Sequence, residues 1–322
     1  MSVMPGRHVR CILFDLGSTL WHHAEPATWT ALETEANLRA VATLRTLLPA
    51  EALPTMADEA LGAALRRMIG DEIRHRYQVT GDREPDFADA TAHALHTLGI
   101  AAADTPLGAR VFEALRVRAV TSRVLFPDAL PTLAELRARG YLLGIVTNRD
   151  YGGEPFLADL RQMGLLDHIE PEHVAISGDV GYRKPHPALF WHALNRLHVP
   201  LAEAAMVGDR LTADVYGAQQ LGLFAVWRPW PREWAAAHDQ ELTSSGSDLR
   251  QPGELESGAG AADAAAAADD ASLFAWARVR EQAYSPQVQT MQPPDAVIRQ
   301  IGDMLRIFRD PTQPLISARL HS

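Results

Sequence analysis

The chain has 322 residues, of which 47% are apolar and 22% charged, the balance of an ordinary globular protein. Its formal net charge of -10 leaves no basic stripe to neutralise a phosphate backbone, so we expect no nucleic-acid partner. The length suffices for one large α/β domain with an insertion, or for two modest domains.

The single cysteine, Cys11, excludes an intrachain disulfide and lies in an apolar run, so we expect a buried, unreactive thiol. Residues 1–10 contain no apolar stretch typical of a signal peptide. The chain also has no run of about 18 apolar residues that would span a membrane. We therefore expect a cytoplasmic protein without a membrane partner.

The first predicted strand covers residues 10–15, a short apolar run followed by glycine and serine. The following stretch, 23–120, changes character. It is rich in Ala, Leu, Arg and Glu, and its apolar residues recur at helical spacing, as at Leu61, Leu65 and Met68. This block predicts roughly four helices and no strand.

From residue 128 onward, helical segments alternate with short apolar strands. Helices are predicted over 128–139, 154–163, 187–197 and 213–221, and strands over 141–146, 174–177, 204–207 and 223–227. Such alternation is typical of a parallel, doubly wound sheet. The strand at 10–15 belongs to the same sheet, with the helical block inserted after it.

The C-terminal part is expected to differ from this core. Residues 235–293 are of low complexity, with Gly/Ser runs, an Ala/Asp tract and one apolar island at 273–276 that can dock on another surface. Residues 295–308 return to helical spacing and predict a last helix packed on the core. The expected domains are a core (1–22, 121–234 and 294–310), a helical cap (23–120), a disordered insertion (235–293) and a tail (311–322).

Four short segments place polar residues at the carboxyl end of a predicted strand, where ligands bind in open α/β sheets. In the first, Asp15 leaves a buried strand and is followed by Gly17 and Ser18. A carboxylate in that position can attack phosphorus or carbon and form a covalent intermediate. An aspartate that merely opens a turn has the same pattern.

The second and third segments carry Thr147-Asn148 and Lys184. A threonine hydroxyl at a strand end can donate a hydrogen bond to a phosphoryl oxygen, although Thr-Asn also opens ordinary turns. Lys184 lies in a proline-bracketed loop before a helix, where a fixed ammonium can neutralise a carboxylate and a phosphoryl group. A solvated loop lysine is the alternative.

The fourth segment contains Asp209 at a strand exit and Asp214 five residues later. Carboxylates at this spacing can hold a hard cation through their oxygens. The alternative is that Asp214 simply favours the start of a helix.

Together, and in this order, the four segments resemble those of the haloacid dehalogenase-like (HAD) hydrolase superfamily. The most specific stretches are Gly-Tyr-Arg-Lys-Pro-His-Pro at 181–187 and Val-Gly-Asp with Asp214 and Gly217-Ala218 behind it. The resemblance covers residues 10 to about 231 and the segment 295–308. It implies a Rossmann-like doubly wound parallel sheet with an inserted all-helical cap, as in helical-cap phosphatases.

The resemblance also implies roles for individual residues. Asp15 corresponds to the nucleophile, and Thr147 and Lys184 to the residues that bind the transferring group. Further contacts to phosphate are implied for Leu16, Gly17 and Asn148. Mg²⁺ is implied as cofactor, held by Asp15, Asp209 and the backbone carbonyl of Gly17. Asp214 corresponds to a residue that orients Lys184 or a metal-bound water.

Gly17 departs from the pattern of the family's phosphatases, which usually carry an aspartate there as general acid and base. The backbone carbonyl still suits a metal, but no side chain remains to transfer the proton. Losing a general acid–base group typically costs about 10²–10⁴-fold in rate. Five nearby residues are candidates for a substitute: His22, His23, Glu25, Tyr182 and His186. Each is better explained as an ordinary surface or cap-hinge residue.

Three functions therefore remain in view. The first is Mg²⁺-dependent hydrolysis of a small phosphate monoester through an aspartyl-phosphate intermediate. The second is a non-catalytic or weakly active binding or regulatory protein that keeps the fold. The third is haloacid dehalogenation, which needs neither the second aspartate nor a metal. The sequence identifies neither the substrate nor the oligomeric state.

Overall fold

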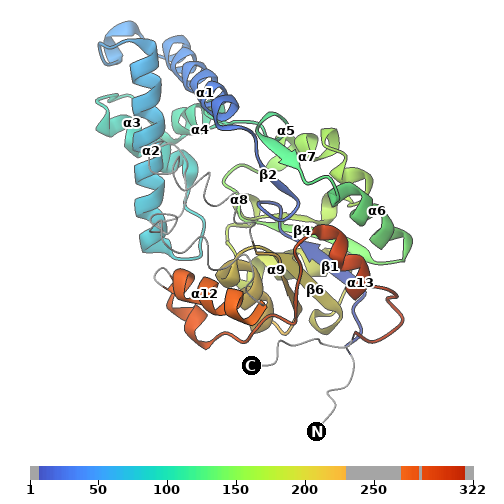
Figure 1. Cartoon of the computed structure of the whole chain (residues 1–322). Coiled ribbons are helices and arrows are strands. Elements are labelled where there is room, and N and C mark those ends of the chain that lie inside the picture. Colours follow the sequence, from blue (N-terminus) through green and yellow to red (C-terminus); the bar gives the residue numbers. More distant parts are fainter. Residues whose placement is uncertain (1–6, 230–269, 283–284, 316–322) are drawn as a thin grey trace. The chain divides into compact units, whose positions relative to one another are not determined.

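A computed structural model describes residues 7–229, 270–282 and 285–315 of the chain (Figure 1). These residues form two compact units. His23–Arg123 form the first, called here the helical unit, and the remaining described residues form the second, called the core unit. Among the described residues, no helix combines the length and the apolar character needed to cross a membrane.

The core unit is built on a six-stranded parallel sheet in the order β5-β4-β1-β6-β7-β8. The strands are β1 (Cys11–Phe14), β4 (Leu142–Thr147), β5 (Val174–Ile176), β6 (Ala204–Gly208), β7 (Phe224–Trp227) and β8 (Ala296–Val297). Strands β1, β5, β6 and β7 are buried along their whole length, as expected for strands covered on both faces. The predicted α/β fold class is confirmed.

The strand order reverses beside β1. After β1 the chain builds β4 and β5 on one side, and then β6 and β7 on the other. Phe14 aligns with Ile145 of β4 and with Val207 of β6. Asp15 therefore leaves the sheet at the switch point, where ligands bind in such folds.

Alternate residues of β1 face opposite sides of the sheet. Cys11 and Leu13 join a buried cluster to which helix α9 (Pro187–Leu197) also contributes, through Phe190 among others. Burial raises the pKa of the Cys11 thiol to about 12, so this cysteine is the buried, unreactive thiol predicted from the sequence.

Helices and turns connect the strands of the core unit. In chain order they are α6 (Ala129–Ala138), α7 (Gly153–Gln162), the turns η2 (Leu165–Asp167) and η3 (Pro171–His173), α8 (Ser177–Val180), α9, the turn η4 (Leu201–Glu203), the π-helical segment η5 (Leu211–Tyr216) and α10 (Gly217–Gln220). Gly140, with φ 92°, follows the helix predicted over 128–139 and favours its end.

The helical unit contains α1 (Pro26–Leu47), the turn η1 (Ala50–Ala52), α2 (Asp58–Thr80), α3 (Phe87–Thr97), α4 (Thr105–Ala114) and α5 (Ala119–Ser122). Asp86 and Asp104 cap α3 and α4 by accepting backbone N–H bonds, which explains why these helices begin there. The chain passes between the units in a two-stranded sheet of β2 (Trp21–His23) and β3 (Arg123–Leu125). The predicted all-helical insertion is thus present.

The predicted single helix over 295–308 is wrong. Residues 296–297 form strand β8, and only the turn η8 (Ile301–Asp303) and α13 (Met304–Ile307) are helical. Asp295 accounts for the difference: its N–H donates to Ala225 O at 2.8 Å, and its Oδ2 accepts from Ala225 N at 2.9 Å. These bonds dock the segment beside β7, a long-range pairing that overrides helical spacing.

The expectation of disorder throughout 235–293 is wrong for the part of this range that the structure describes, which begins at residue 270. Residues 270–282 form helix α12, and Pro286–Thr290 form the turn η7. Leu273, Phe274 and Ala277 are buried in the same cluster as α9. The apolar island predicted to dock therefore does so, and burial of its side chains stabilises a helix that composition alone does not predict. Residues 235–269 lie outside the described part.

Candidate active site

Asp15 lies directly beyond β1, between the ends of β4 and β6. Its N–H donates to Val207 O at 2.9 Å, so the sheet ladder continues up to this residue. The next turn is held by the Leu16 carbonyl, which accepts from Thr19, Leu20 and Trp21 N–H at 3.2, 2.9 and 3.0 Å. A rigid turn thus follows a carboxylate that is only 8% exposed.

Gly17 is exposed in this turn, and the left-handed backbone conformation belongs to its neighbour Ser18, with φ 54°. Within the described part of the chain, a Cβ built on Gly17 would contact only Asp15 Oδ2 within 4 Å, at 3.9 Å. Position 17 therefore has room for a side chain beside Asp15 Oδ2.

Lys184 enters the site from the loop between α8 and α9. Its Nζ lies 2.6 Å from Asp15 Oδ1, 2.6 Å from Asp214 Oδ1 and 2.6 Å from the Val146 carbonyl oxygen. The side chain is 2% exposed. It is also the only lysine among the 30 lysine and arginine residues of the chain. A compact ammonium with three donors suits these three oxygens, whereas a planar guanidinium does not.

Asn148 fixes the backbone from which Lys184 projects. Its Nδ2 donates to Lys184 O at 3.0 Å, and its Oδ1 accepts from Lys184 N at 2.7 Å. This positioning role was not foreseen in the sequence. A direct contact between Asn148 and a phosphate stays a prediction.

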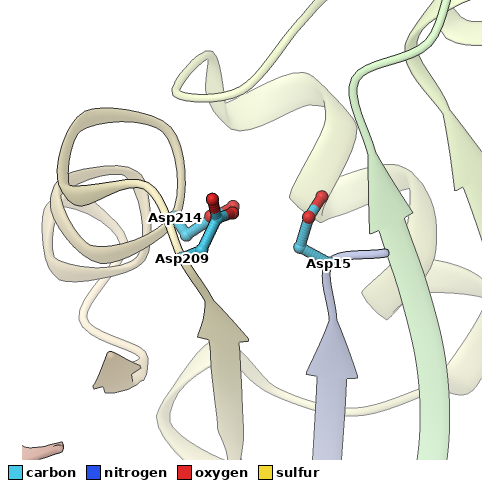
Figure 2. Close-up of side chains that lie close together, drawn as sticks. All are labelled: Asp15, Asp209 and Asp214. Atoms are coloured by element: carbon cyan, nitrogen blue, oxygen red, sulfur yellow. The ribbon is translucent and has the colours of Figure 1, made fainter. Parts of the chain in front are cut away.

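Asp209 and Asp214 complete a cluster of carboxylates with Asp15. One oxygen from each lies within 4.8 Å of the others, and Figure 2 shows all three side chains projecting beyond the strand ends toward a common space. Asp214 Oδ2 accepts from Arg210 N at 2.9 Å, which fixes its carboxylate. Gly208 makes the close approach possible, because a Cβ there would lie 2.2 Å from Asp214 Cγ.

The electrostatics of the cluster are unbalanced. Burial raises the pKa of Asp15 to about 6; the Asp214 charge adds to this rise, and the Lys184 charge opposes it. Burial and then the charges of Asp15 and Asp214 raise the pKa of Asp209 well above its ordinary value. Burial alone would lower the pKa of Lys184, but the two carboxylates outweigh burial and raise it.

This donor set fits a divalent cation. Three carboxylates against one ammonium leave a surplus of two negative charges when all groups are ionised. Carboxylate oxygens are also the ligands that hard cations such as Mg²⁺ prefer. These side chains therefore suit Mg²⁺, the cofactor that the family resemblance implies.

Thr147 is the last residue of β4 and is 5% exposed. Because Ile145 aligns with Phe14, Thr147 lies at the same edge of the sheet as Asp15. The structure thus brings together the ends of β1, β4 and β6 and the Lys184 loop, which carry the residues that the sequence singled out.

Arg228 is a site neighbour that the sequence analysis missed. It directly follows β7, is 3% exposed, and donates from Nη1 to the carbonyl of Ser18. Its guanidinium lies 4.0 Å from the ring centroid of Phe126, an arrangement that favours a cation. The sequence contained a signal for this residue, because Arg228 directly follows a predicted strand and Asp209 also lies at a strand exit.

Three of the five candidates for a substitute proton donor, His22, Tyr182 and His186, have structural contacts in the core unit. His186 caps α9, because its Nδ1 accepts from Ala188 N at 3.2 Å, and its ring stacks on Tyr182 at 4.2 Å. The His22 ring lies 5.2 Å from that of Phe126. None of these contacts indicates a proton donor for the leaving group.

Comparison with known proteins gives a family match. A family model described as haloacid dehalogenase-like hydrolase matches residues 9–222. Glyceraldehyde 3-phosphate phosphatase of Pyrococcus furiosus is 42% identical over 103 residues, which are 31% of this chain and 40% of that protein. Phosphoglycolate phosphatase of Rhodospirillum rubrum is 33% identical over 222 residues, 66% of this chain and 77% of that protein.

Among solved structures, the 2-haloacid dehalogenase of Pseudomonas syringae pv. Tomato is similar with a TM-score of 0.51. The comparison covers 92% of this chain and 97% of that one at 24% identity. At this identity the likeness supports the fold and not the reaction.

Proposed function

The chain belongs to the haloacid dehalogenase-like hydrolases, and on this premise we propose that it is a Mg²⁺-dependent phosphatase of small phosphate monoesters. The observation that carries the proposal is the cluster of three carboxylates, Asp15, Asp209 and Asp214, which leaves a surplus of two negative charges beside Lys184 when all groups are ionised. The phosphatases among its relatives give further support.

In the proposed reaction, Asp15 Oδ2 attacks the phosphorus atom, while Oδ1 stays bound to Lys184. The bond from phosphorus to the leaving oxygen breaks, and its electron pair moves to that oxygen. Thr147 and the backbone of Leu16 and Gly17 donate to the phosphoryl oxygens. Water then attacks the phosphorus of the aspartyl phosphate, which releases inorganic phosphate and restores the carboxylate.

Asp15, Asp209 and the carbonyl of Gly17 are the proposed ligands of Mg²⁺, with Asp214 orienting Lys184. When bound, the cation supplies positive charge that stabilises the phosphoryl group during transfer. Asp214 and the Val146 carbonyl fix the Lys184 ammonium, so the ammonium needs no reorganisation during the reaction.

The direct test is release of phosphate from para-nitrophenyl phosphate with Mg²⁺ and with EDTA. We expect Mg²⁺-dependent turnover. Absence of turnover on this ester and on a panel of sugar and acyl phosphates would favour the non-catalytic alternative.

Carbon–halogen hydrolysis is a second candidate, which one observation favours. Position 17 bears no side chain, and a departing halide needs no proton. The same assay, run with 2-chloropropionate and a chloride readout, separates the two reactions. Chloride release that EDTA does not change would replace the phosphatase proposal.

Gly17→Asp is expected to raise turnover of esters with poor leaving groups by up to about 10²-fold, within the range of general acid–base catalysis. The turn accepts the change, because Gly17 has no positive φ and the new Cβ meets only Asp15 Oδ2 at 3.9 Å. Rates across aryl phosphates of graded leaving-group pKa measure the effect. An unchanged slope would show that proton transfer does not limit the reaction at this position.

Mg²⁺ binding is expected to weaken as the pH falls through about 6, the pKa of Asp15. A proton on the carboxyl competes with the cation, so the apparent affinity falls by at most about tenfold per pH unit for this group. Asp209→Asn should weaken binding further at every pH, because an amide oxygen carries no charge. Calorimetric titration measures both effects. Equal affinity at about pH 5 and pH 8, or in variant and parent, would contradict the assignment.

A further inference from the structure

Helix α12 (Asp270–Gln282) lies outside the family match, which ends at residue 222. It nevertheless belongs to the core unit, where Leu273, Phe274 and Ala277 are buried. The residues that carry the expected chemistry are all at or before Asp214, so α12 lies outside the segment that supplies them.

Glu281, near the end of α12, binds the start of the π-helical segment η5. Its Oε1 accepts from Leu211 N at 2.9 Å, and its Oε2 accepts from Thr212 N at 2.9 Å and from Thr212 Oγ1 at 2.8 Å. The first N–H groups of a helix lack partners within the helix, and Arg210 at the N-cap position provides no side-chain cap. A carboxylate from 70 residues later in the chain fills this need.

The segment that Glu281 caps is the one that carries the proposed metal carboxylates. Asp209 precedes η5 by two residues, and Asp214 lies within it. Asp214 in turn contacts Lys184 Nζ at 2.6 Å. A shift at the start of η5 therefore moves the carboxylates of Asp209 and Asp214, and the second of these is a partner of the Lys184 ammonium.

A second contact ties α12 to the same segment. The ring of Phe274 meets Trp227 edge-on, with centroids 6.1 Å apart and an interplanar angle of 75°. Trp227 Nε1 donates to the Asp209 carbonyl at 2.9 Å. Helix α12 thus supports the segment at Asp209 through Trp227 and at Leu211 and Thr212 through Glu281.

We propose that Glu281 is a positioning residue of the active site, which holds the Asp209–Asp214 segment in its cation-binding geometry by capping η5. The metal part of this inference rests on the proposed function, whereas the cap itself does not. Loss of a partner that orients metal ligands commonly costs 10- to 100-fold in metal affinity, so Glu281→Ala should weaken Mg²⁺ about tenfold or more.

The experiment uses the full-length chain with three variants and two readouts. Glu281→Ala removes all three contacts, and Thr212→Val removes only the hydroxyl contact. Gln282→Ala, an exposed neighbour on the same helix, is the matched control. The readouts are the calorimetric affinity for Mg²⁺ and amide hydrogen exchange of the peptide covering residues 209–216, measured without metal.

Glu281→Ala should speed amide exchange in this peptide and weaken the affinity for Mg²⁺ about tenfold. Thr212→Val should give an exchange rate and an affinity between those of Glu281→Ala and the parent. Gln282→Ala should match the parent in both readouts. Unchanged exchange and affinity in Glu281→Ala would overturn the proposal, as would equal losses in Gln282→Ala. Faster exchange with unchanged affinity would reduce Glu281 to an ordinary helix cap. A parent that binds no Mg²⁺ would refute the proposed function, while the exchange arm still tests the cap. If Glu281→Ala does not fold, Thr212→Val decides between these outcomes.

Discussion

Asp15→Asn is expected to reduce hydrolysis by about 10⁴-fold or more, the scale on which enzymes lose activity when their nucleophile is removed. The amide has nearly the shape of the carboxylate but cannot attack phosphorus. The fold should survive, because a neutral group replaces a carboxyl whose pKa burial has already raised to about 6. Single-turnover and steady-state rates with para-nitrophenyl phosphate measure the loss.

An exposed aspartate of the helical unit provides the matched control. Asp71→Asn changes the same atoms at a side chain that is 62% exposed, so its rates should equal those of the parent. Substantial turnover in a folded Asp15→Asn protein, with its unfolding midpoint near that of the parent, would exclude Asp15 as the nucleophile.

Lys184→Met is expected to have the second largest effect, and on stability as well as on rate. Breaking a buried ion pair by removing one partner costs about 3–5 kcal/mol, because the remaining charges are left uncompensated. In this protein Asp15 and Asp214 would both lose the ammonium at 2.6 Å. Urea unfolding at about pH 8 in EDTA should show a deficit of about this size.

The sign of the pH dependence follows from the carboxyl groups. In Lys184→Met the pKa of Asp15 loses the lowering effect of the ammonium and rises further, so the folded state binds more protons than the unfolded state. The deficit should therefore shrink as the pH falls from about 8 toward 5, through the pKa of Asp15 near 6. Saturating Mg²⁺ should also reduce it, because the cation supplies the missing positive charge.

Lys184→Arg separates charge from geometry. It keeps a cation in the cluster, so we expect more of the stability to remain than in Lys184→Met. Activity should still be lost, because the larger planar group cannot reproduce the three short contacts of Nζ. Full activity in Lys184→Arg, or parent-like stability of Lys184→Met at all pH values, would contradict this account of the ammonium.

The sequence predicted the sheet, and it predicted that the candidate site residues meet at one edge, because both depend on short-range patterns. Each strand of the central sheet except β8 is a short apolar run, and Asp15, Thr147 and Asp209 mark the carboxyl ends of three of them. Parallel pairing brings those ends to one edge, so residues far apart in sequence meet without any further information. Lys184 could be recognised because its loop keeps the specific Gly-Tyr-Arg-Lys-Pro-His-Pro pattern.

What the sequence could not supply were contacts set by distant parts of the chain. The segment 295–308 has apolar residues at helical spacing, and only the pairing of residues 296–297 with β7 makes them a strand. Glu281 lies in a stretch whose composition predicts no order, and no local pattern links it to Leu211. The amide of Asn148 is engaged by the Lys184 backbone, a geometry that residue type alone does not reveal.

The central claim is a covalent phosphate on Asp15, and trapping this species tests it most directly. The protein is mixed with para-nitrophenyl phosphate and Mg²⁺ and quenched with borohydride, which reduces an acyl phosphate to an alcohol. Peptide mass spectrometry then reads residue 15. The account predicts homoserine at position 15 in the presence of substrate, and aspartate when substrate is omitted. Steady release of phosphate with aspartate intact at position 15 under the same quench would contradict it.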